Sequence, residues 1–225
     1  MSSQRNATQS SALDRAVEAF AAGEPVLIHD FDDREGEVDM VYPAPDVDSA
    51  AVSRLRNDAG GLVCVALGPE VADAFELPFL ADEIDHPVAE SDHLGYDERS
   101  SFSLTVNHRD TYTGITDADR ALTISRLGEG AADPDAIDFP REFRAPGHVH
   151  LLRASRYGLA DRRGHTEMAV ALAHEAGRPP AAVVCEMLDD ETGEARSVED
   201  ARAYANEHDI PYVEGADLVE AFRAD

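Results

Sequence analysis

The sequence predicts a single three-layer α/β (α+β) domain in which helices flank a mixed β-sheet. Helical and strand-like segments alternate along all 225 residues without an internal repeat, as they do in α/β proteins. The length is enough for one large α/β domain or two small ones, and with 43% hydrophobic residues the chain can bury a core. No apolar run approaches the roughly 20 residues that a membrane-spanning helix needs. We expect a flexible N-terminus over residues 1–10 and one domain over residues 11–225.

The elements of the N-terminal half follow from hydrophobic periodicity and from the glycines and capping residues that interrupt it. A helix is expected where apolar residues recur every three or four positions, and a strand where a short apolar run lies between turn residues. In chain order these rules predict a helix over 11–22 ending at Gly23, strands over 25–29 and 40–43, a helix over 48–59 capped by Asp48, a strand over 62–67, a short helix over 69–76, and an edge or half-buried strand over 102–107.

The C-terminal half follows the same rules. A segment rich in Gly, Ala, Asp and Pro predicts a loop from Gly128 to Pro146. Around it the sequence predicts a helix over 117–127 capped by Thr116 or Asp117, a strand over 149–153, a helix over 165–176, a strand over 181–188, a helix over 198–208, a short strand near Tyr212 and a helix over 216–223.

The two cysteines, Cys64 and Cys185, both lie in apolar strand-like runs. We expect them to be buried free thiols, because their spacing fits no zinc motif and a reducing compartment disfavours a disulfide. The first ten residues are polar and lack the apolar core of a signal peptide, so we expect a cytoplasmic protein.

The charge of the chain excludes several classes of partner. The formal net charge is -27, from 46 acidic and 19 basic residues, and every basic residue is arginine. So negative a protein repels polyanions, which argues against nucleic acid and anionic membranes as partners. Because high salt screens repulsion between surface acids, the composition predicts a protein from a salt-adapted source.

The lack of lysine restricts the chemistry. Without lysine there is no side-chain Schiff base, and hence no pyridoxal phosphate linkage or lysine-dependent aldolase. A nucleotide-binding P-loop is excluded as well, because that motif needs its lysine. If the protein cleaves carbon bonds beside a carbonyl group, a metal ion must therefore act as the electrophile.

A short acidic run is the strongest local signal. Six acids fall between Asp30 and Asp39, with Arg34 among them, directly after an apolar strand. Carboxylates crowded in one loop repel each other unless a cation joins them, so the run predicts a divalent metal site beside an anion-binding arginine. A solvated, salt-adapted surface loop is the alternative. An EF-hand is poorly supported, because the run lacks its glycine and its final glutamate.

Three further features have candidate functional residues. Arginines, a glycine and Thr166 surround His165 over 162–167 at a predicted helix start, which favours phosphate binding. His148 follows a Pro-Gly turn, although a lone histidine is more often structural than catalytic. Glu186 interrupts an apolar strand and is either solvent-facing or held for acid–base work.

In these segments the chain resembles 3,4-dihydroxy-2-butanone 4-phosphate synthases, enzymes of riboflavin biosynthesis. The matching segments are DDREGEVDMVYPA (32–44), TGITDADRALT (113–123), APGHVHLLRA (145–154), RRGHTEMAVALAHEAGRPPAAVVCEML (162–188) and ARAYANEHDIP (201–211). The resemblance spans nearly the whole chain with the motifs in order. Some family members have Arg-Glu-Asn-Glu-Gly-Asp where this chain has Arg-Glu-Gly-Glu-Val-Asp at 34–39, so the charged positions are kept.

The resemblance implies a role for each candidate residue. Glu35 and His165 would bind Mg²⁺, or Mn²⁺, in a site of two ions. His148 and Glu186 would be essential catalytic groups, and Glu37 and Asp39 of the acidic loop would supply further acids and bases. Substrate contacts would come from Arg34, Glu35, Asp39, Thr113, Arg162, Arg163, Gly164, His165 and Thr166.

The resemblance also implies the reaction and the assembly. Family members convert D-ribulose 5-phosphate into formate and L-3,4-dihydroxy-2-butanone 4-phosphate, and they are homodimers whose active sites share residues across the interface. The chain would be monofunctional, without the GTP cyclohydrolase domain that some relatives carry. Two rival interpretations are an ATP-dependent transferase with the related threonylcarbamoyl-adenylate synthase fold, and a non-catalytic acidic protein that binds Mg²⁺ or Ca²⁺.

Overall fold

The computed structural model describes residues 2–89, 95, 97 and 99–222 of the chain. Within these residues seven strands form one sheet, in the order β4-β5-β3-β6-β2-β1-β7. The strands are β1 (Val26–His29), β2 (Val38–Pro43), β3 (Cys64–Leu67), β4 (Phe102–His108), β5 (Phe143–Arg153), β6 (Ala181–Glu186) and β7 (Tyr212–Glu214). Two of the pairs, β1 with β7 and β3 with β5, are parallel and the others are antiparallel, which confirms the predicted mixed sheet.

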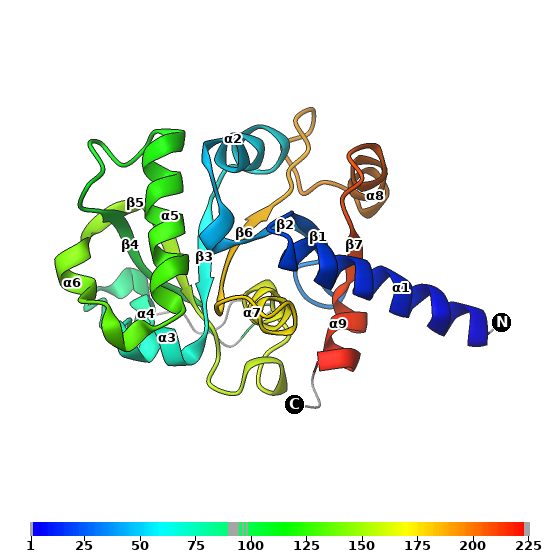
Figure 1. Ribbon diagram of the computed structural model, residues 1–225, viewed down its shortest axis with the longest axis horizontal. Helices are drawn as coiled ribbons and strands as arrows, with labels where there is room; N and C mark the ends of the chain where they lie inside the picture. The colour runs from blue at the N-terminus through cyan, green and yellow to red at the C-terminus, as the bar shows by residue number, and fades with distance from the viewer. Residues whose placement is uncertain (1, 90–94, 96, 98, 223–225) are drawn as a thin grey trace.

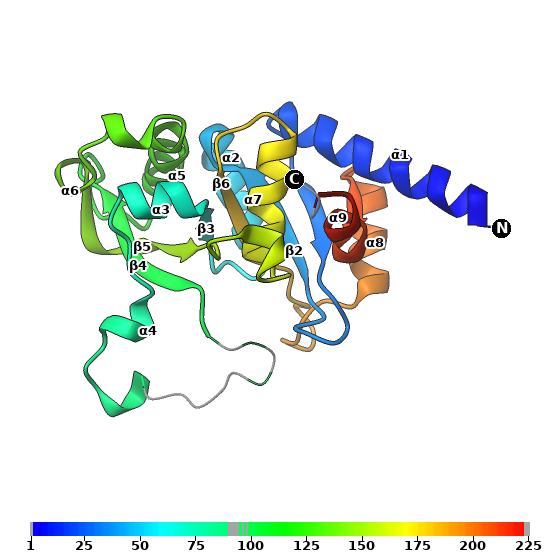
Figure 2. The same cartoon turned by 90° about the horizontal axis from the view of Figure 1, so that it is seen from below.

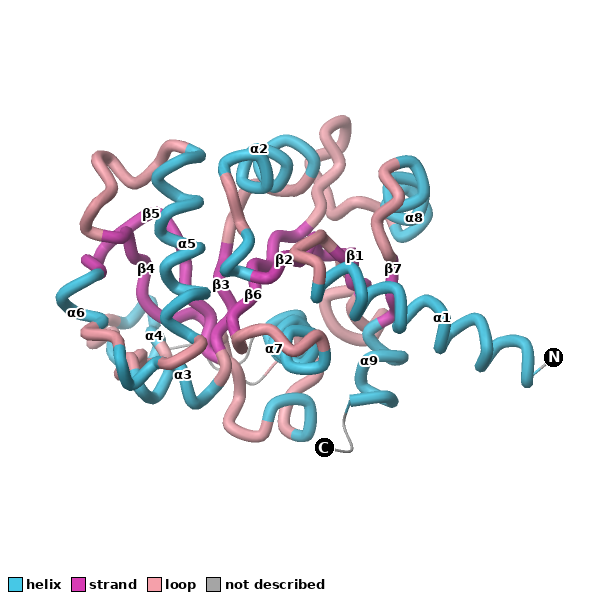
Figure 3. The backbone as a smooth tube through the Cα atoms, viewed as in Figure 1, coloured by secondary structure: helices cyan, strands magenta, loops and turns pink. Residues whose placement is uncertain are grey.

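Helices cover both faces of the sheet and make the predicted three layers (Figure 1, Figure 3). In Figure 1, α2 and α8 lie above the strands, and α7 and α9 lie below them. The helices are α1 (Ser2–Ala21), α2 (Ser49–Asp58), α3 (Pro69–Ala74), α4 (Leu80–Glu83), α5 (Asp117–Ala131), α6 (Phe139–Glu142), α7 (His165–Glu175), α8 (Val198–Glu207) and α9 (Gly215–Phe222), with 3₁₀ turns η1 (Ala44–Asp46), η2 (Pro87–Ala89), η3 (Pro134–Ala136) and η4 (Gly158–Ala160).

Alternation along the strands builds two separate cores. Val65 of β3 and Val183 of β6 pack in the core that contains residues of α2, α5 and α8. Their neighbours Cys64 and Val184 face the opposite core, which contains residues of α1, α7 and α9. Successive side chains of a strand point to opposite faces, so apolar strands can serve both cores. Figure 2 shows α7 lying across the middle strands on the second face.

The prediction of a loop from Gly128 to Pro146 was wrong. Helix α5 continues to Ala131, a 3₁₀ turn and the short helix α6 follow, and β5 begins at Phe143. Gly128 lies where α5 crosses η1, and a Cβ atom there would clash with the backbone of Ala44 and Pro45. This glycine therefore permits close packing inside a helix, where the sequence pattern suggested a helix end.

The remaining elements agree with the predictions to within a few residues, apart from the start of α1 and the unpredicted α4. Asp48 and Thr116 cap α2 and α5, as expected, by accepting the backbone N–H groups of Ala51 and Asp119. Helix α1 begins at Ser2, before the predicted start at 11, because residues 2–10 contain no glycine or proline that would break it. Flexibility of residues 1–10 stays a prediction.

Cys64 and Cys185 are buried free thiols in β3 and β6, as predicted. Strand β4 lies at one end of the sheet, which agrees with the predicted edge position. Among the described helices, none has the length and apolar character required to cross a lipid bilayer.

Candidate active site

The acidic run forms a closed loop between two neighbouring antiparallel strands. Strand β1 ends at His29 and β2 begins opposite it at Val38, with residues 30–37 between them. The backbone N–H of Asp30 donates to the carbonyl of Glu37 at 2.9 Å and holds the two ends of the loop together. Because β1 and β2 each pair with strands on both sides, the loop is anchored on rigid elements. It presents its carboxylates at the ends of these two strands.

Two carboxylates meet across the neighbouring strand pair. Asp39 of β2 lies directly opposite Glu186 of β6 in the antiparallel register. Their neighbours Val38, Met40 and Cys185 pack in the core on the other face, so both carboxylates point toward the face that α7 covers. Asp39 is only 2% exposed. This register explains why Glu186 interrupts an otherwise apolar strand.

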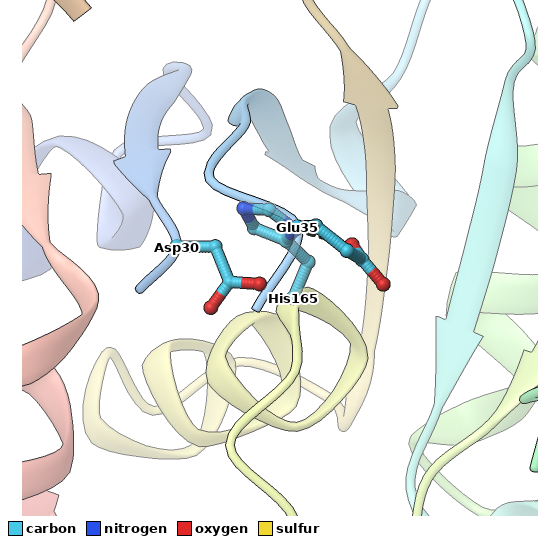
Figure 4. Close-up of side chains that lie close together, drawn as sticks. All are labelled: Asp30, Glu35 and His165. Carbon is cyan, nitrogen blue, oxygen red and sulfur yellow. Dashed lines mark ion pairs between the residues drawn. The ribbon is translucent and has the colours of Figure 1, made fainter. Parts of the chain in front are cut away.

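The N-terminus of α7 brings an imidazole to the same place. His165 is the first residue of α7, and its Nδ1 atom lies 3.5 Å from Glu35 Oε2 and 3.6 Å from Asp39 Oδ1. Donor atoms of Asp30, Glu35 and His165 all lie within 4.8 Å of one another. Figure 4 shows these three side chains converging from the end of β1, the acidic loop and the start of α7.

A cavity of about 340 Å³ opens at this point. Its polar lining consists largely of residues that the sequence analysis singled out, and its apolar lining comes from β3, β4, β5 and β6. The lining residues are Arg34, Glu35, Glu37, Asp39, Cys64, Ser100, Ser101, Phe102, Leu152, Arg162, His165, Thr166, Val184 and Glu186. The volume suits a small, highly polar molecule.

Burial and crowding shift the pKa values of the acidic groups. Burial raises the pKa of Asp39 to about 8, with Glu186, Glu35 and Glu37 adding repulsion while the charge of His165 opposes the rise. Burial likewise raises the pKa of Glu37, and the charges of Glu186 and Glu35 reinforce the effect. Burial also disfavours the charged form of Glu35, but the interactions with His165 and Arg34 outweigh it and lower the pKa.

The contacts with the neighbouring carboxylates raise the pKa of the His165 imidazole. Burial alone would lower the pKa of His165, but the charge of Asp39 and the contact with Glu35 raise it to about 9. Without a cation the pair of Asp39 and His165 therefore binds protons more readily than the separate side chains would in water. A bound cation would replace those protons.

Two arginines border the cavity and share one carboxylate. Asp97 Oδ2 accepts from Arg34 Nη2 at 3.1 Å and from Arg162 Nε at 2.5 Å. Arg162 also donates through Nη1 to the fully buried Glu167 at 2.8 Å, and Arg34 donates through Nε to Asp30 at 3.3 Å. Both guanidinium groups are thus fixed in orientation before any ligand binds.

Arg163 and Gly164 lie next to the cavity and are not part of its lining. The Arg163 side chain is 43% exposed, stacks over the Phe31 ring at 4.4 Å and pairs with Asp33 at 3.6 Å. Gly164 precedes the first turn of α7, whose amino end faces the acidic loop. Of residues 162–166, only Arg162, His165 and Thr166 line the cavity.

Thr113 and His148 lie away from the cavity within this chain. Both residues are exposed; His148 belongs to β5, and Thr113 follows β4 in the chain with its carbonyl near Asn107, at the other end of the β4–β5 pair. The cavity-lining Leu152 is four residues further along β5, a separation of about 13 Å in an extended strand. A single chain therefore does not bring these two candidates together with Glu35 and His165.

Sequence reasoning missed several residues of the site. Asp30 was counted within the acidic run without being assigned a role, although its burial at 2% exposed distinguishes it from the exposed Asp32 and Asp33. Asp97 carried no local signal, because its role depends on two arginines distant in sequence. The apolar lining residues Phe102, Leu152 and Val184 looked like ordinary strand residues.

Comparison with known proteins agrees with this geometry. The family model for 3,4-dihydroxy-2-butanone 4-phosphate synthase matches residues 14–221. A curated protein of that name from Archaeoglobus fulgidus is 50% identical over 223 residues, covering 94% of this chain and 94% of its own. One from Methanothermobacter thermautotrophicus is 44% identical over 218 residues, covering 93% and 95%.

Solved structures show the same fold. A 3,4-dihydroxy-2-butanone 4-phosphate synthase from Candida albicans superposes with a TM-score of 0.78 at 33% identity, covering 93% of this chain and 96% of the other. Another synthase, described as a complex with two magnesium ions, gives a TM-score of 0.77 at 31% identity, covering 92% and 94%. With its fold, its acidic cavity and the family match over residues 14–221, the chain belongs to the 3,4-dihydroxy-2-butanone 4-phosphate synthase family.

Proposed function

We propose that this chain converts D-ribulose 5-phosphate into formate and L-3,4-dihydroxy-2-butanone 4-phosphate. One observation supports this above all. The acidic loop, the amino end of α7 and Glu186 converge on a single small cavity that offers metal ligands, anion-binding arginines and proton-transfer groups together. The reaction needs all three, because its substrate is an anionic sugar phosphate and its chemistry starts beside a carbonyl group.

The donor atoms fit a hard divalent cation. Within the described residues, His165 Nε2 and Asp39 Oδ1 are buried without a hydrogen-bond partner, which is costly unless a ligand satisfies them. Glu35 and His165 would hold Mg²⁺ or Mn²⁺, with Asp30 close enough to contribute. The related structure described with two magnesium ions supports a two-ion site. When bound, the cation would stabilise negative charge on substrate oxygens.

The phosphate of the substrate would bind at the arginine corner. Arg162, Thr166 and the backbone N–H groups at the start of α7 offer donors to an anion, and the helix dipole favours negative charge there. Arg34 would hold the sugar part beside Glu35. Arg163 would add positive charge from the rim of the cavity.

Proton transfer would involve the paired carboxylates. Removal of a proton beside the ketone gives an enediolate, and loss of water, rearrangement and release of formate require further proton transfers. A carboxyl group that keeps its proton near neutral pH can donate it, which the raised pKa of Asp39 permits. Glu186 and Glu37 line the same cavity and would accept and return protons during the later steps.

A second copy of the chain would complete the site. His148 and Thr113 are exposed at the far end of the β4–β5 pair, where they can contribute to the cavity of a partner but not to their own. We therefore propose a homodimer with shared active sites. Residues 11–225 would form its single synthase unit, with a cytoplasmic location and adaptation to high salt.

Formate release tests the proposal. Purified protein in high KCl is given D-ribulose 5-phosphate with Mg²⁺, with Mn²⁺ or with EDTA, and formate is measured by a coupled dehydrogenase. We expect release with either metal and none with EDTA. Folded protein that releases no formate under any of these conditions would refute the activity, and metal-induced stabilisation without turnover would then favour a purely metal-binding role.

A further inference from the structure

A bulge in β5 exposes His148 opposite a buried asparagine. Val106 of β4 pairs with Val149 of β5, but the next residue, Asn107, pairs with Arg144. Residues 145–148 therefore bulge out of β5 opposite a single step of β4. Bulges of this kind commonly redirect a side chain beside a functional site. His148 is exposed at this bulge, whereas Asn107 is 2% exposed.

The hydrogen bonds of Asn107 identify which end of its amide is which. The backbone N–H of His148 donates to Asn107 Oδ1 at 2.8 Å. A backbone N–H can only donate, so the atom that it meets must be the amide oxygen. The amide nitrogen then faces the carbonyl of Thr113, with Nδ2 3.5 Å from that oxygen. Both contacts agree on one orientation of the amide.

This orientation determines what the imidazole of His148 can do. Asn107 Nδ2 lies 3.1 Å from His148 Nδ1, closer than Oδ1 at 3.4 Å. Because Nδ2 is a donor, Nδ1 must accept, and the ring proton of neutral His148 must then be on Nε2. A proton on Nδ1 would set two donors against each other at the shorter distance.

Two glycines hold the asparagine in this position. A Cβ atom on Gly114 would clash with the Asn107 side chain, and one on Gly147 would clash with the backbone of Val106 and Asn107. Gly114 also has φ +91°, which other residues rarely adopt. These glycines belong to the TGIT and APGH segments, so the bulge and the loop after β4 close on the asparagine from two sides.

We propose that Asn107 is a positioning residue that sets the tautomer of His148, with Nδ1 accepting from the amide and Nε2–H directed outward. This inference rests on the proposed function in assigning His148 to the reaction. Neutral His148 would present a donor at Nε2, suited to an oxygen atom of the substrate. It would not present a lone pair there, so in this form it would act as a donor and not as a base.

Nitrogen NMR tests the tautomer directly. Metal-loaded protein with ¹⁵N-labelled histidine is measured at about pH 8.5, where an ordinary imidazole is neutral. The His148 signal is assigned as the one that H148Q lacks. We expect the chemical shifts of an Nε2–H tautomer in the wild type. An Nδ1–H tautomer would overturn the proposal, whatever the activity of the protein.

The variant N107D has the same shape but offers only acceptors when ionised. We expect it to move the ring proton of His148 to Nδ1 and to lower kcat roughly 10-fold or more, which is less than the 10²- to 10⁴-fold contribution of a proton-transfer group because the imidazole itself remains. Because Asn107 does not line the cavity, KM for D-ribulose 5-phosphate should change much less. N57D, at an exposed position of α2, adds the same charge elsewhere and should leave both parameters unchanged.

The outcomes separate the two proposals. An N107D enzyme with unchanged kcat would overturn the positioning role, and equal losses in N57D would assign the effect to charge alone. If N107D does not fold, the wild-type spectrum still tests the tautomer. An Nε2–H signal in a folded wild type that releases no formate would refute the proposed function and leave the tautomer assignment standing.

Discussion

His165 Nδ1, at the start of α7, lies 3.5 Å from Glu35 Oε2 in the loop between β1 and β2. The contact joins the two segments that the sequence analysis linked to metal and phosphate binding. Burial of His165 at 6% exposed means that this contact is shielded from water and acts at low dielectric. The predicted consequences of this arrangement concern metal binding, substrate binding, proton transfer, pH and salt.

E35Q should abolish Mg²⁺ dependence together with activity. The amide keeps the size of the side chain but removes the negative charge that attracts the cation. Mg²⁺ titration by calorimetry and formate release are the measurements. D32N is a matched control on the same loop, because the Asp32 side chain is 96% exposed. Full activity in E35Q would refute its assignment as a ligand.

R162A should raise KM for D-ribulose 5-phosphate, because a phosphate contact is lost, and should also destabilise the fold. Arg162 is the charged partner of Glu167, whose side chain is fully buried and accepts the Ser155 N–H with its other oxygen. Removing one partner of a buried ion pair costs about 3–5 kcal/mol. Urea unfolding measures this loss, and E167Q added to R162A should restore part of the stability.

R163A provides the comparison for R162A. The Arg163 side chain is 43% exposed and its ion-pair partner is at the surface, so its loss should hardly change stability. Unchanged KM in R162A, measured on folded protein, would count against a phosphate contact at this arginine.

E186Q should lower kcat on the order of 10²-fold or more if Glu186 transfers a proton. The amide keeps the shape and the pairing of β6 with β2, so the fold should persist. The measurement is steady-state kinetics together with a thermal melt. A variant that loses only stability and keeps its kcat would show that the carboxylate is structural.

Mg²⁺ affinity should rise with pH in the range from about 6 to 9. The raised pKa values of Asp39, about 8, and His165, about 9, mean that the pair holds protons more tightly in the cation-free site than its side chains would in water. Cation binding must displace those protons, so it is easier when fewer are bound. Calorimetry in buffers of different ionisation enthalpy should show proton release at neutral pH.

The same shifts predict how the cation-free protein responds to pH. For Asp39 and His165 the folded pKa lies above the unfolded one, so each stabilises the fold fully below the unfolded value and loses that contribution as pH rises through about 8 or 9. The melting temperature of the protein in EDTA should therefore fall as pH rises toward about 9. With Mg²⁺ bound the fall should be smaller. A Mg²⁺-induced increase in melting temperature that becomes smaller as pH rises would contradict this linkage.

Stability should rise as KCl increases from tenths molar to molar. A formal net charge of -27 creates self-repulsion, which salt screens. Thermal melts with and without Mg²⁺ separate general screening from occupancy of the metal site. Equal melting temperatures at low and high salt would remove the basis for proposing a salt-adapted protein.

Local patterns in the sequence were sufficient for most of the fold. Apolar runs and alternation located the strands, although β5 begins six residues before the predicted start, and the capping residues Asp48 and Thr116 marked the starts of two helices correctly. The acidic run and the segment over 162–167 were recognised because several unusual residues lie within a few positions. Such signals are local, since hydrogen-bond capping and strand alternation depend on neighbours in sequence.

The tertiary structure decided which candidates meet. Register across β2 and β6 places Asp39 opposite Glu186, and the packing of α7 brings His165 to both Asp39 and Glu35. It also separates His148 from this cavity within one chain, and it gives Asp97 its role between two arginines.

The sequence by itself thus determined most of the element types and identified the acidic loop and the chemical character of the site. The continuation of α5 past Gly128, the pairing of Asp97 and the link from Asn107 to His148 came only from the tertiary structure. The physical reason is the same in each case. A glycine, an aspartate or an asparagine gains its role from a partner far away in sequence, and close packing and strand register alone determine which partner that is.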